Sequence, residues 1–260
     1  MPDIPLMTLL LLCLAAGAAG WIDAVVGGGG LLLLPALLVG LPGFQPTYIL
    51  GTNKAIAICG TTGAAVTYTR KAPVDVRIAV RIGIAAAIGS LAGASLASGI
   101  DGAVLRPLIM VVLLAVLAFV LLRPAFGTAP ALAGPLSRHR VLAAVLGVGL
   151  GIGFYDGLIG PGTGTFLVIA LAATLGTDLV TSSATAKVVN VCTNVGALVT
   201  FGFQGTVLWR LAALLACFNL AGGMVGARMA LKRGSGFVRG ILVLVVVSLV
   251  VKLGYDQWLS

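Results

Sequence analysis

The sequence contains little charge: only 9% of its 260 residues are Asp, Glu, Lys or Arg, whereas soluble domains have about a quarter. Hydrophobic residues make up 60% of the chain, and the mean hydropathy is +1.17. Apolar stretches recur from end to end, and no connection between them is long enough to form a water-soluble domain. Because backbone polar groups in lipid must pair internally, we expect helices. The sequence therefore predicts an all-α polytopic membrane protein with a single membrane domain, residues 1–260.

Residue patterns that support catalysis or metal binding are also lacking. The one histidine, His139, lies between two arginines in a basic connection, and a lone histidine makes no metal site. Tyr155-Asp156 matches half of an intramembrane aspartyl protease signature, but no GxGD motif supplies the second aspartate. Four cysteines without metal-ligand spacing are expected to pack as small apolar residues: Cys13, Cys59, Cys192 and Cys217. We therefore expect no enzyme activity, no cofactor and no metal.

Acidic residues are scarcer than basic ones, seven against 16, which gives a formal net charge of +9. In a soluble protein this excess would suggest a nucleic-acid partner. Here most Lys and Arg lie in short connections between apolar segments, as the positive-inside rule describes. The expected partner is therefore the lipid bilayer. The N-terminal stretch lacks the basic region of a signal peptide, so we expect it to form the first transmembrane helix.

Glycine is abundant and forms two matching clusters that interrupt apolar segments. Residues 20–33 read GWIDAVVGGGGLLL and residues 153–166 read GFYDGLIGPGTGTF, so Asp23 and Asp156 occupy equivalent positions 133 residues apart (156 − 23). Lys54 and Lys187 are related by the same offset. Such a shared register indicates an internal duplication of the kind found in secondary transporters. We predict a first repeat over 1–125, a linker over 126–138 and a second repeat over 139–260.

We expect about eight transmembrane segments, with helices broken at the glycines. In the first half the apolar segments cover residues 4–26, 31–39, 47–69, 78–98 and 105–122. The second of these is too short to span alone, and the four glycines before it predict an unwound stretch. Parallel and inverted repeats both stay open, although the basic connections favour inversion. Small-residue stripes at 89–97 and 222–230 suit either internal helix packing or a homodimer face.

Two lysines inside apolar segments are the first candidates for a binding site. Lys54 and Lys187 follow small polar residues near the start of a predicted span, where a helix N-terminus adds unpaired N–H groups. Together they could hold an anion in a central cavity. Alternatively, each lysine reaches the membrane interface or neutralises an aspartate. The predicted substrate-binding residues are Lys54, Lys187, Thr52, Asn53, Thr185, Gly27, Gly28, Gly29, Gly30, Gly160, Gly162, Thr163, Gly164, Asn190 and Asn194.

Asp23 and Asp156 lie one helical turn before the glycines and are candidates for proton coupling. An ionisable side chain within a membrane segment is by default a functional-site hypothesis. The same carboxylates could instead pair with the two lysines, or cap the polar backbone that the breaks expose. These three roles stay open from the sequence.

These elements together resemble the sulfite exporter TauE/SafE family of membrane permeases, over nearly the whole chain. The matching pieces are GWIDAVVGGGG, GTNKAIAICG, GFYDGLIGPGTGTF, ATAKVVNVCTNVG and GGMVGARM. The resemblance implies a multi-pass protein of the bacterial inner (plasma) membrane that moves small sulfur-containing anions such as sulfite or organosulfonates. One departure from internal symmetry is Ala186, which stands where the first half has Asn53.

The sequence thus predicts a secondary transporter of small anions, with proton coupling as a further hypothesis. The alternatives are an anion channel and a membrane signalling or scaffold protein that uses the same polar core. Alternating access is expected to come from rocking of one repeat-derived bundle against the other. Substrate identity, direction of transport and coupling ion are not encoded in any of the motifs.

Overall fold

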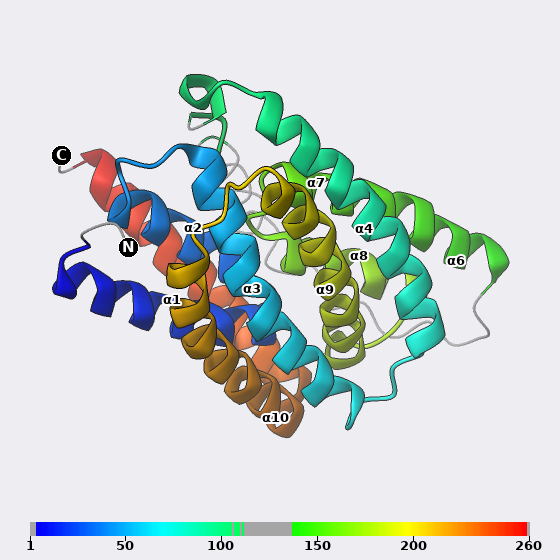
Figure 1. The fold of residues 1–260 in the computed structure, drawn as a ribbon. Helices are drawn as coiled ribbons and strands as arrows, with labels where there is room; N and C mark the ends of the chain where they lie inside the picture. Colours follow the sequence, from blue (N-terminus) through cyan, green and yellow to red (C-terminus); the bar gives the residue numbers. More distant parts are fainter. Residues whose placement is uncertain (1–3, 106, 110, 112–136, 259–260) are drawn as a thin grey trace.

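The computed structural model describes residues 4–105, 107–109, 111 and 137–258, and this part of the chain is built from helices without strands (Figure 1). The result confirms the prediction of an all-α polytopic membrane protein. The helices are α1 (Leu6–Val26), α2 (Gly29–Gly40), α3 (Pro46–Thr69), α4 (Val76–Gly99), α6 (Arg138–Ala143), the π-helix η1 (Ala144–Ile152), α7 (Gly153–Leu158), α8 (Thr163–Leu175), α9 (Leu179–Phe203) and α10 (Trp209–Trp258).

Five helical stretches of the described residues are long and apolar enough to cross a bilayer: Leu6–Val26, Val76–Gly99, Arg138–Leu158, Leu179–Phe203 and Trp209–Gly234. Helix α3 has 24 residues, or about 36 Å, which also exceeds a hydrocarbon core of about 30 Å. Helices α2 and α8 are apolar but have only 12 and 13 residues. The expected count of eight spans stays a prediction, because most of the expected span 105–122 and most of the linker 126–138 lie outside the described residues.

Both glycine clusters end one helix and begin a short one. Gly27 follows α1 with a φ of 80°, a left-handed conformation that glycine adopts without strain. Gly160 and Gly162 have φ of 88° and 77° between α7 and α8, and the Tyr155 hydroxyl donates a hydrogen bond to the Pro161 carbonyl across this turn. The predicted breaks are therefore present. The first is shorter than expected, because Gly29 and Gly30 already belong to α2.

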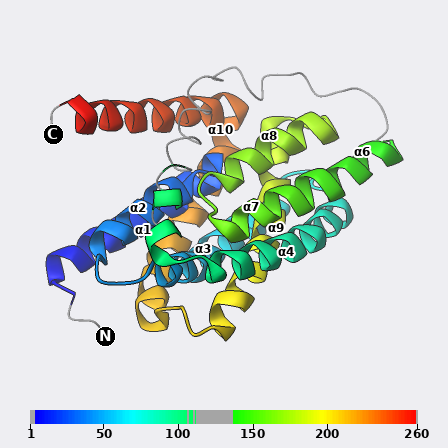
Figure 2. The same cartoon turned by 90° about the horizontal axis from the view of Figure 1, so that it is seen from above.

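The helices form two bundles that do not coincide with the two halves of the sequence. Helices α1, α2 and α3 pack with α10, whereas α4 packs with η1, α7 and α9, and α8 joins this second bundle (Figure 2). The bundles meet chiefly where α3 packs on α9. The first bundle thus combines α1, α2 and α3 with α10 of the other half, and the second combines η1, α7, α8 and α9 with α4 of the other half.

The small-residue stripes pack helices of this chain closely against one another. A side chain at Gly89 or Gly93 of α4 would overlap the backbone of Leu150 or Phe154, and one at Gly222 of α10 would overlap the backbone of Gly17 in α1. Close backbone approach of this kind is what small residues permit in membrane helices. Of the two roles considered for the stripes, internal packing is the one that the structure shows.

The equivalent helices α3 and α9 run in opposite directions. Gln45, just before α3, and Gln204, just after α9, line one small pocket together with Ser98 near the end of α4. At the other end of the molecule, Arg70 follows α3 and lines a groove with Arg228 of α10. Opposite directions of equivalent helices are the arrangement expected for inverted repeats.

Candidate functional site

The site is centred on two ion pairs, each joining one half of the sequence to the other. Lys54 Nζ of α3 lies 2.8 Å from Asp156 Oδ2 of α7, and both side chains are 3% exposed. Lys187 Nζ of α9 donates a hydrogen bond of 2.9 Å to Asp23 Oδ2 of α1. The Lys187 side chain is fully buried and the Asp23 side chain is 15% exposed. Each pair also joins the two bundles, because α1 and α3 lie in one and α7 and α9 in the other.

These pairs correspond to one of the alternatives left open by the sequence, in which the lysines neutralise the aspartates. Two positive and two negative charges make the site formally neutral in this conformation. Neutrality matters because a buried lysine without a partner is costly. Any anion that binds to either ammonium group would have to displace a carboxylate.

The prediction that Lys54 and Lys187 lie at helix N-termini is wrong. Lys54 lies eight residues after Pro46, the first residue of α3, and Lys187 lies eight residues after Leu179, the first residue of α9. The partial charge of a helix terminus acts within about the first turn. The N-termini of α3 and α9 are thus too far from the two ammonium groups to form a joint anion site.

The helix N-termini that do reach the site belong to the two short helices α2 and α8. Their cap residues, Gly28 and Gly162, provide no side-chain hydrogen bond to the first turn. In their first turns the N–H groups of Leu31 and Thr163 donate to Gly28 O and Gly160 O. What the two termini offer the site is their partial positive charge, a feature that binds anions. The two breaks are joined, because Thr165 donates from its N–H to Gly27 O and from its hydroxyl to Val26 O.

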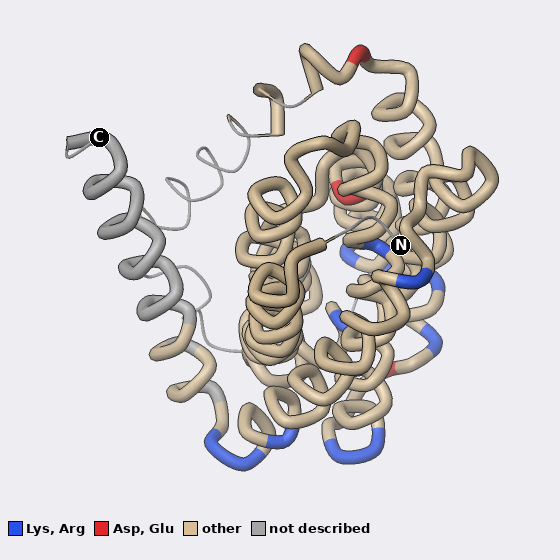
Figure 3. Tube along the Cα trace, turned by 60° about the vertical axis from the view of Figure 1, so that its left-hand side comes forward, with Lys and Arg blue, Asp and Glu red and all other residues tan. Residues whose placement is uncertain are grey.

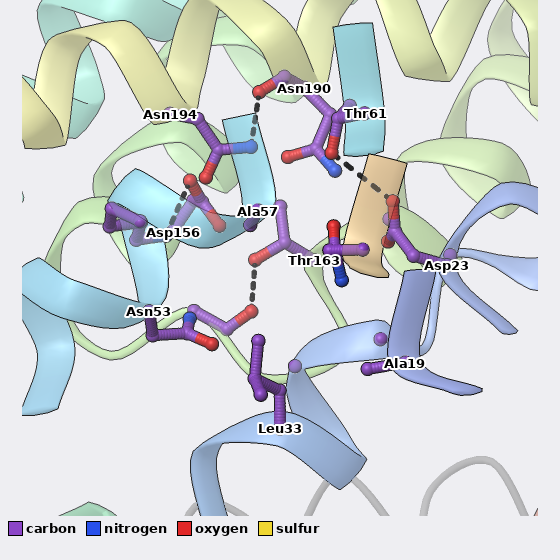
Figure 4. Close-up of a pocket in the computed structure, with 17 residues that line it drawn as sticks. Ala19, Asp23, Leu33, Asn53, Ala57, Thr61, Asp156, Thr163, Asn190 and Asn194 are labelled. Atoms are coloured by element: carbon purple, nitrogen blue, oxygen red, sulfur yellow. Dashed lines mark hydrogen bonds and ion pairs between the residues drawn. The ribbon is translucent and has the colours of Figure 1, made fainter. Parts of the chain in front are cut away.

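These elements enclose a cavity of about 30 Å³ (Figure 4), enough for about one or two water molecules. It is lined by residues from both halves: Ala19, Asp23, Gly27, Gly29, Gly30, Leu33, Asn53, Lys54, Ala57, Thr61, Asp156, Gly160, Thr163, Gly164, Asn190, Asn194 and Asn219. A substrate larger than water therefore requires its walls to move. Twelve of the predicted site residues are in this lining, so the structure brings most of them together.

The other five predicted residues do not line the cavity: Gly28, Thr52, Gly162, Thr185 and Lys187. The Thr52 hydroxyl accepts from the Leu208 N–H, and the Thr185 hydroxyl donates to Thr181 O in its own helix. These two threonines therefore support the backbone. Lys187 acts on the cavity only through Asp23.

Two polar residues at the cavity were absent from the predicted set. Thr61 Oγ1 donates a hydrogen bond of 3.2 Å to Asp23 Oδ2, and Asn219 Nδ2 donates one of 2.8 Å to Ala16 O. Thr61 lies two turns beyond Lys54 on the same helix, and this spacing already indicates from the sequence that it could line a polar path near the lysine. Asn219 has no such signal, because its position depends on how α10 packs against α1.

The amide of Asn53 supplies an unused hydrogen-bonding group. Asn53 is 6% exposed, lines the cavity, and its Oδ1 has no hydrogen-bond partner among the residues that the structure describes. In contrast, Asn194 Nδ2 donates to Asn190 O within α9. A buried amide oxygen without a donor is costly, and a water molecule or a ligand O–H group would supply one.

The start of α9 is fixed outside the apolar core by Asp178, whose Oδ1 accepts from the N–H groups of Val180 and Thr181. Partial burial raises the pKa of this carboxyl, but the hydrogen bonds from Thr181 and Val180 outweigh it, so the pKa lies below its ordinary value. The cap is thus ionised at neutral pH and holds the helix that carries Lys187.

Comparison with known proteins matches residues 12–253 to the family described as sulfite exporter TauE/SafE. A probable membrane transporter protein, ORF9, of Sinorhizobium sp is 33% identical, covering 98% of this chain and 96% of the relative. One of Haemophilus influenzae is 33% identical, covering 98% of both chains. The probable membrane transporter protein YfcA of Escherichia coli is 32% identical, covering 96% of this chain and 91% of its own length. No solved structure matches the chain significantly.

Proposed function

The chain belongs to the sulfite exporter TauE/SafE family of membrane transporters, and from this premise we propose that it is a secondary transporter of small anions in the cell inner membrane. Sulfite and short organosulfonates are the proposed substrates. The family name supports the sulfur oxyanion. The geometry supports a small polar ligand, since the cavity has a volume of about 30 Å³ and only three of its lining side chains, Ala19, Leu33 and Ala57, are apolar.

The observation that carries this proposal is the positive charge that surrounds one buried cavity. Lys54 lines it directly, Lys187 acts on it through Asp23, and the N-termini of α2 and α8, each with a partial positive charge, begin at Gly29 and Thr163. Broken helices whose N-termini meet near the bilayer midplane bind anionic groups in other transporters. Oxygens of a sulfur oxyanion would accept from the Lys54 ammonium group once Asp156 releases it.

Proton coupling follows from charge balance within the ion pairs. As long as Asp23 and Asp156 are ionised, both ammonium groups are neutralised. Protonation of one carboxylate frees its lysine for an anion, and with a singly charged anion the net charge of the site is then the same as before binding. We therefore propose that one proton and one anion move in the same direction.

Alternating access is proposed to occur between the two bundles and not between the two sequence halves. Both ion pairs cross from one bundle to the other. Their exchange for lysine–anion contacts loosens the bundle interface at α3 and α9 and lets the bundles tilt. The rocking unit inferred from the sequence is revised accordingly, because α4 and α10 each pack with the opposite half.

The test is flux of labelled sulfite and of a short organosulfonate into proteoliposomes, with and without an imposed pH gradient. We expect saturable, uphill flux in the wild type and a loss of at least about a hundredfold in Lys54→Gln and Lys187→Gln, as befits removal of a buried charged partner. Lys232→Gln, an exposed position in α10, is the matched control. Wild-type flux in both buried-site variants would refute the site.

The same measurement separates the carrier from a channel. An anion channel would show a flux that rises linearly with anion concentration. It would never accumulate the anion beyond its electrochemical equilibrium. Uphill flux that does not depend on the pH gradient would support a transporter and contradict proton coupling. Absence of flux for both compounds, in protein that binds neither by calorimetry, would remove the substrate class.

A further inference from the structure

A second binding surface lies on the outside of the α1–α2–α3–α10 bundle. A groove of about 700 Å³ runs between α3 and the part of α10 before Gly234. Its walls include Ile58, Val66, Leu220 and Met224, and the basic residues Arg70, Lys71 and Arg228 form one end. It is more than 20 times larger than the central cavity and shares no lining residue with it.

The basic end of the groove has no anionic partner in the described part of the chain. The two ion pairs of the described residues both belong to the central site. Arg70, Lys71 and Arg228 are all exposed. Figure 3 shows Lys and Arg gathered at this end of the molecule, at the bend of α10 and the neighbouring helix end. Three adjacent uncompensated cations favour an anionic ligand.

The apolar part of the groove has the dimensions of one bilayer leaflet. From Ile58 to Arg70 the helix rises about 18 Å, at about 1.5 Å per residue, and half of a hydrocarbon core is about 15 Å. The charged end thus lies at headgroup depth when the apolar walls lie among acyl chains. By the positive-inside rule this end faces the cytoplasm, where the leaflet carries anionic lipids.

We propose that this groove is a binding site for an anionic phospholipid. The phosphate lies among Arg70, Lys71 and Arg228, and one acyl chain follows the walls formed by Val66, Leu220 and Met224. Free phosphate would satisfy the charges but leave the apolar walls uncovered. A zwitterionic lipid would fill the walls but leave positive charge uncompensated. The site is independent of the transported substrate.

The experiment uses the full chain purified in detergent, with phosphatidylglycerol as probe and phosphatidylcholine and inorganic phosphate as comparisons. Native mass spectrometry counts retained lipid, and thermal unfolding measures the stabilisation that each addition produces. The charge variant is Arg70→Gln/Lys71→Gln/Arg228→Gln. Its matched control, Arg77→Gln/Arg81→Gln/Lys232→Gln, removes three exposed basic side chains that do not line the groove.

We expect phosphatidylglycerol to stabilise the wild type and the control equally, and its affinity for the charge variant to fall on the order of a hundredfold. This follows from about 1 kcal/mol per basic side chain near an anionic surface and tenfold per 1.4 kcal/mol. Equal losses of phosphatidylglycerol affinity in the charge variant and the control would show that only the overall surface charge matters, and would contradict a specific site. Equal stabilisation by phosphatidylcholine would contradict the preference for an anionic headgroup. Equal stabilisation by inorganic phosphate would show that no lipid is needed.

A second variant keeps the test decisive if the charge variant does not fold. Val66→Trp fills the groove without altering charge, at a position that is 43% exposed. We expect it to fold, to keep its basic end and to retain less phosphatidylglycerol. Unchanged retention would overturn the acyl-chain part of the proposal. A lipid-independent dimer that Val66→Trp dissociates would instead assign the groove to a second copy of the chain.

Discussion

The two glycine breaks are built from the same sequence element but lie in different surroundings. In each, an aspartate precedes a left-handed glycine by four residues, Asp23 before Gly27 and Asp156 before Gly160. Each aspartate pairs with a lysine of the other half. Asp156 is closed off at 3% exposure, whereas Asp23 is 15% exposed and also accepts a hydrogen bond from Thr61.

This difference indicates that the two pairs do not separate equally easily. A fully buried pair loses much when it is broken, because each charge is then left without a partner. A pair with partial exposure and a second donor tolerates separation better. We infer that the Asp23–Lys187 pair opens first and that the Asp156–Lys54 pair holds the bundles together until it does.

We expect the largest effect from Gly27→Ala, which changes the first glycine break itself. Gly27 has a φ of 80°, and an added Cβ would overlap the backbone of Gly164, so neither the turn nor the contact between the breaks can form. We expect loss of the folded protein, measured as aggregation in size-exclusion chromatography.

Gly28→Ala is the neighbouring control. Its Cβ would make ordinary van der Waals contacts with the side chains of Ile22, Leu31 and Val26, at 3.4, 3.8 and 3.9 Å. Gly28 has a φ of −97°, which alanine adopts without strain. We expect it to elute as the wild type. A folded Gly27→Ala protein with full transport would show that the contact between the two breaks is dispensable.

The next effect compares the two ion pairs directly. Lys54→Met leaves Asp156 buried without a partner, which costs about 3–5 kcal/mol. Lys187→Met leaves Asp23 with Thr61 and partial solvent access, so we expect a smaller loss of unfolding free energy. Thermal unfolding of both variants measures the difference.

Rescue distinguishes pairing from packing. Replacing the stranded carboxylate as well, in Lys54→Met/Asp156→Asn, should recover most of the stability and none of the transport. Equal losses in the two single variants, or a double variant as unstable as Lys54→Met alone, would show that the difference in exposure has no energetic consequence.

The sequence was sufficient for the local features of this site. The breaks follow from glycine between apolar runs, the short helices from the length of 31–39, and the possible lysine–aspartate pairing from the cost of burying either charge alone. Twelve of the predicted site residues lie around one cavity because the 133-residue register places equivalent residues at equivalent depths.

The long-range features were beyond the sequence. Stripes such as Gly89–Gly93 predict that a helix packs closely but do not identify its partner, so the exchange of α4 and α10 between bundles could not be foreseen. Likewise the depth of Lys54 within α3 depends on where that helix begins. With Pro46 as its first residue, the helix N-termini near the cavity are those of α2 and α8 instead.

The smallest expected effect tests the extra hydrogen bond on Asp23. Thr61→Val is nearly isosteric and removes the donor at 3.2 Å, so we expect a loss of about 1 kcal/mol in unfolding free energy. Thr67→Val on the same helix is the control, because its hydroxyl bonds only to Gly63 O within α3. In the Lys187→Met background the Thr61→Val cost should grow, since the hydroxyl is then the remaining side-chain donor to Asp23 in the described structure. An unchanged cost in that double-mutant cycle would mean that Thr61 and Lys187 act independently, and the asymmetry between the two breaks would then rest on exposure alone.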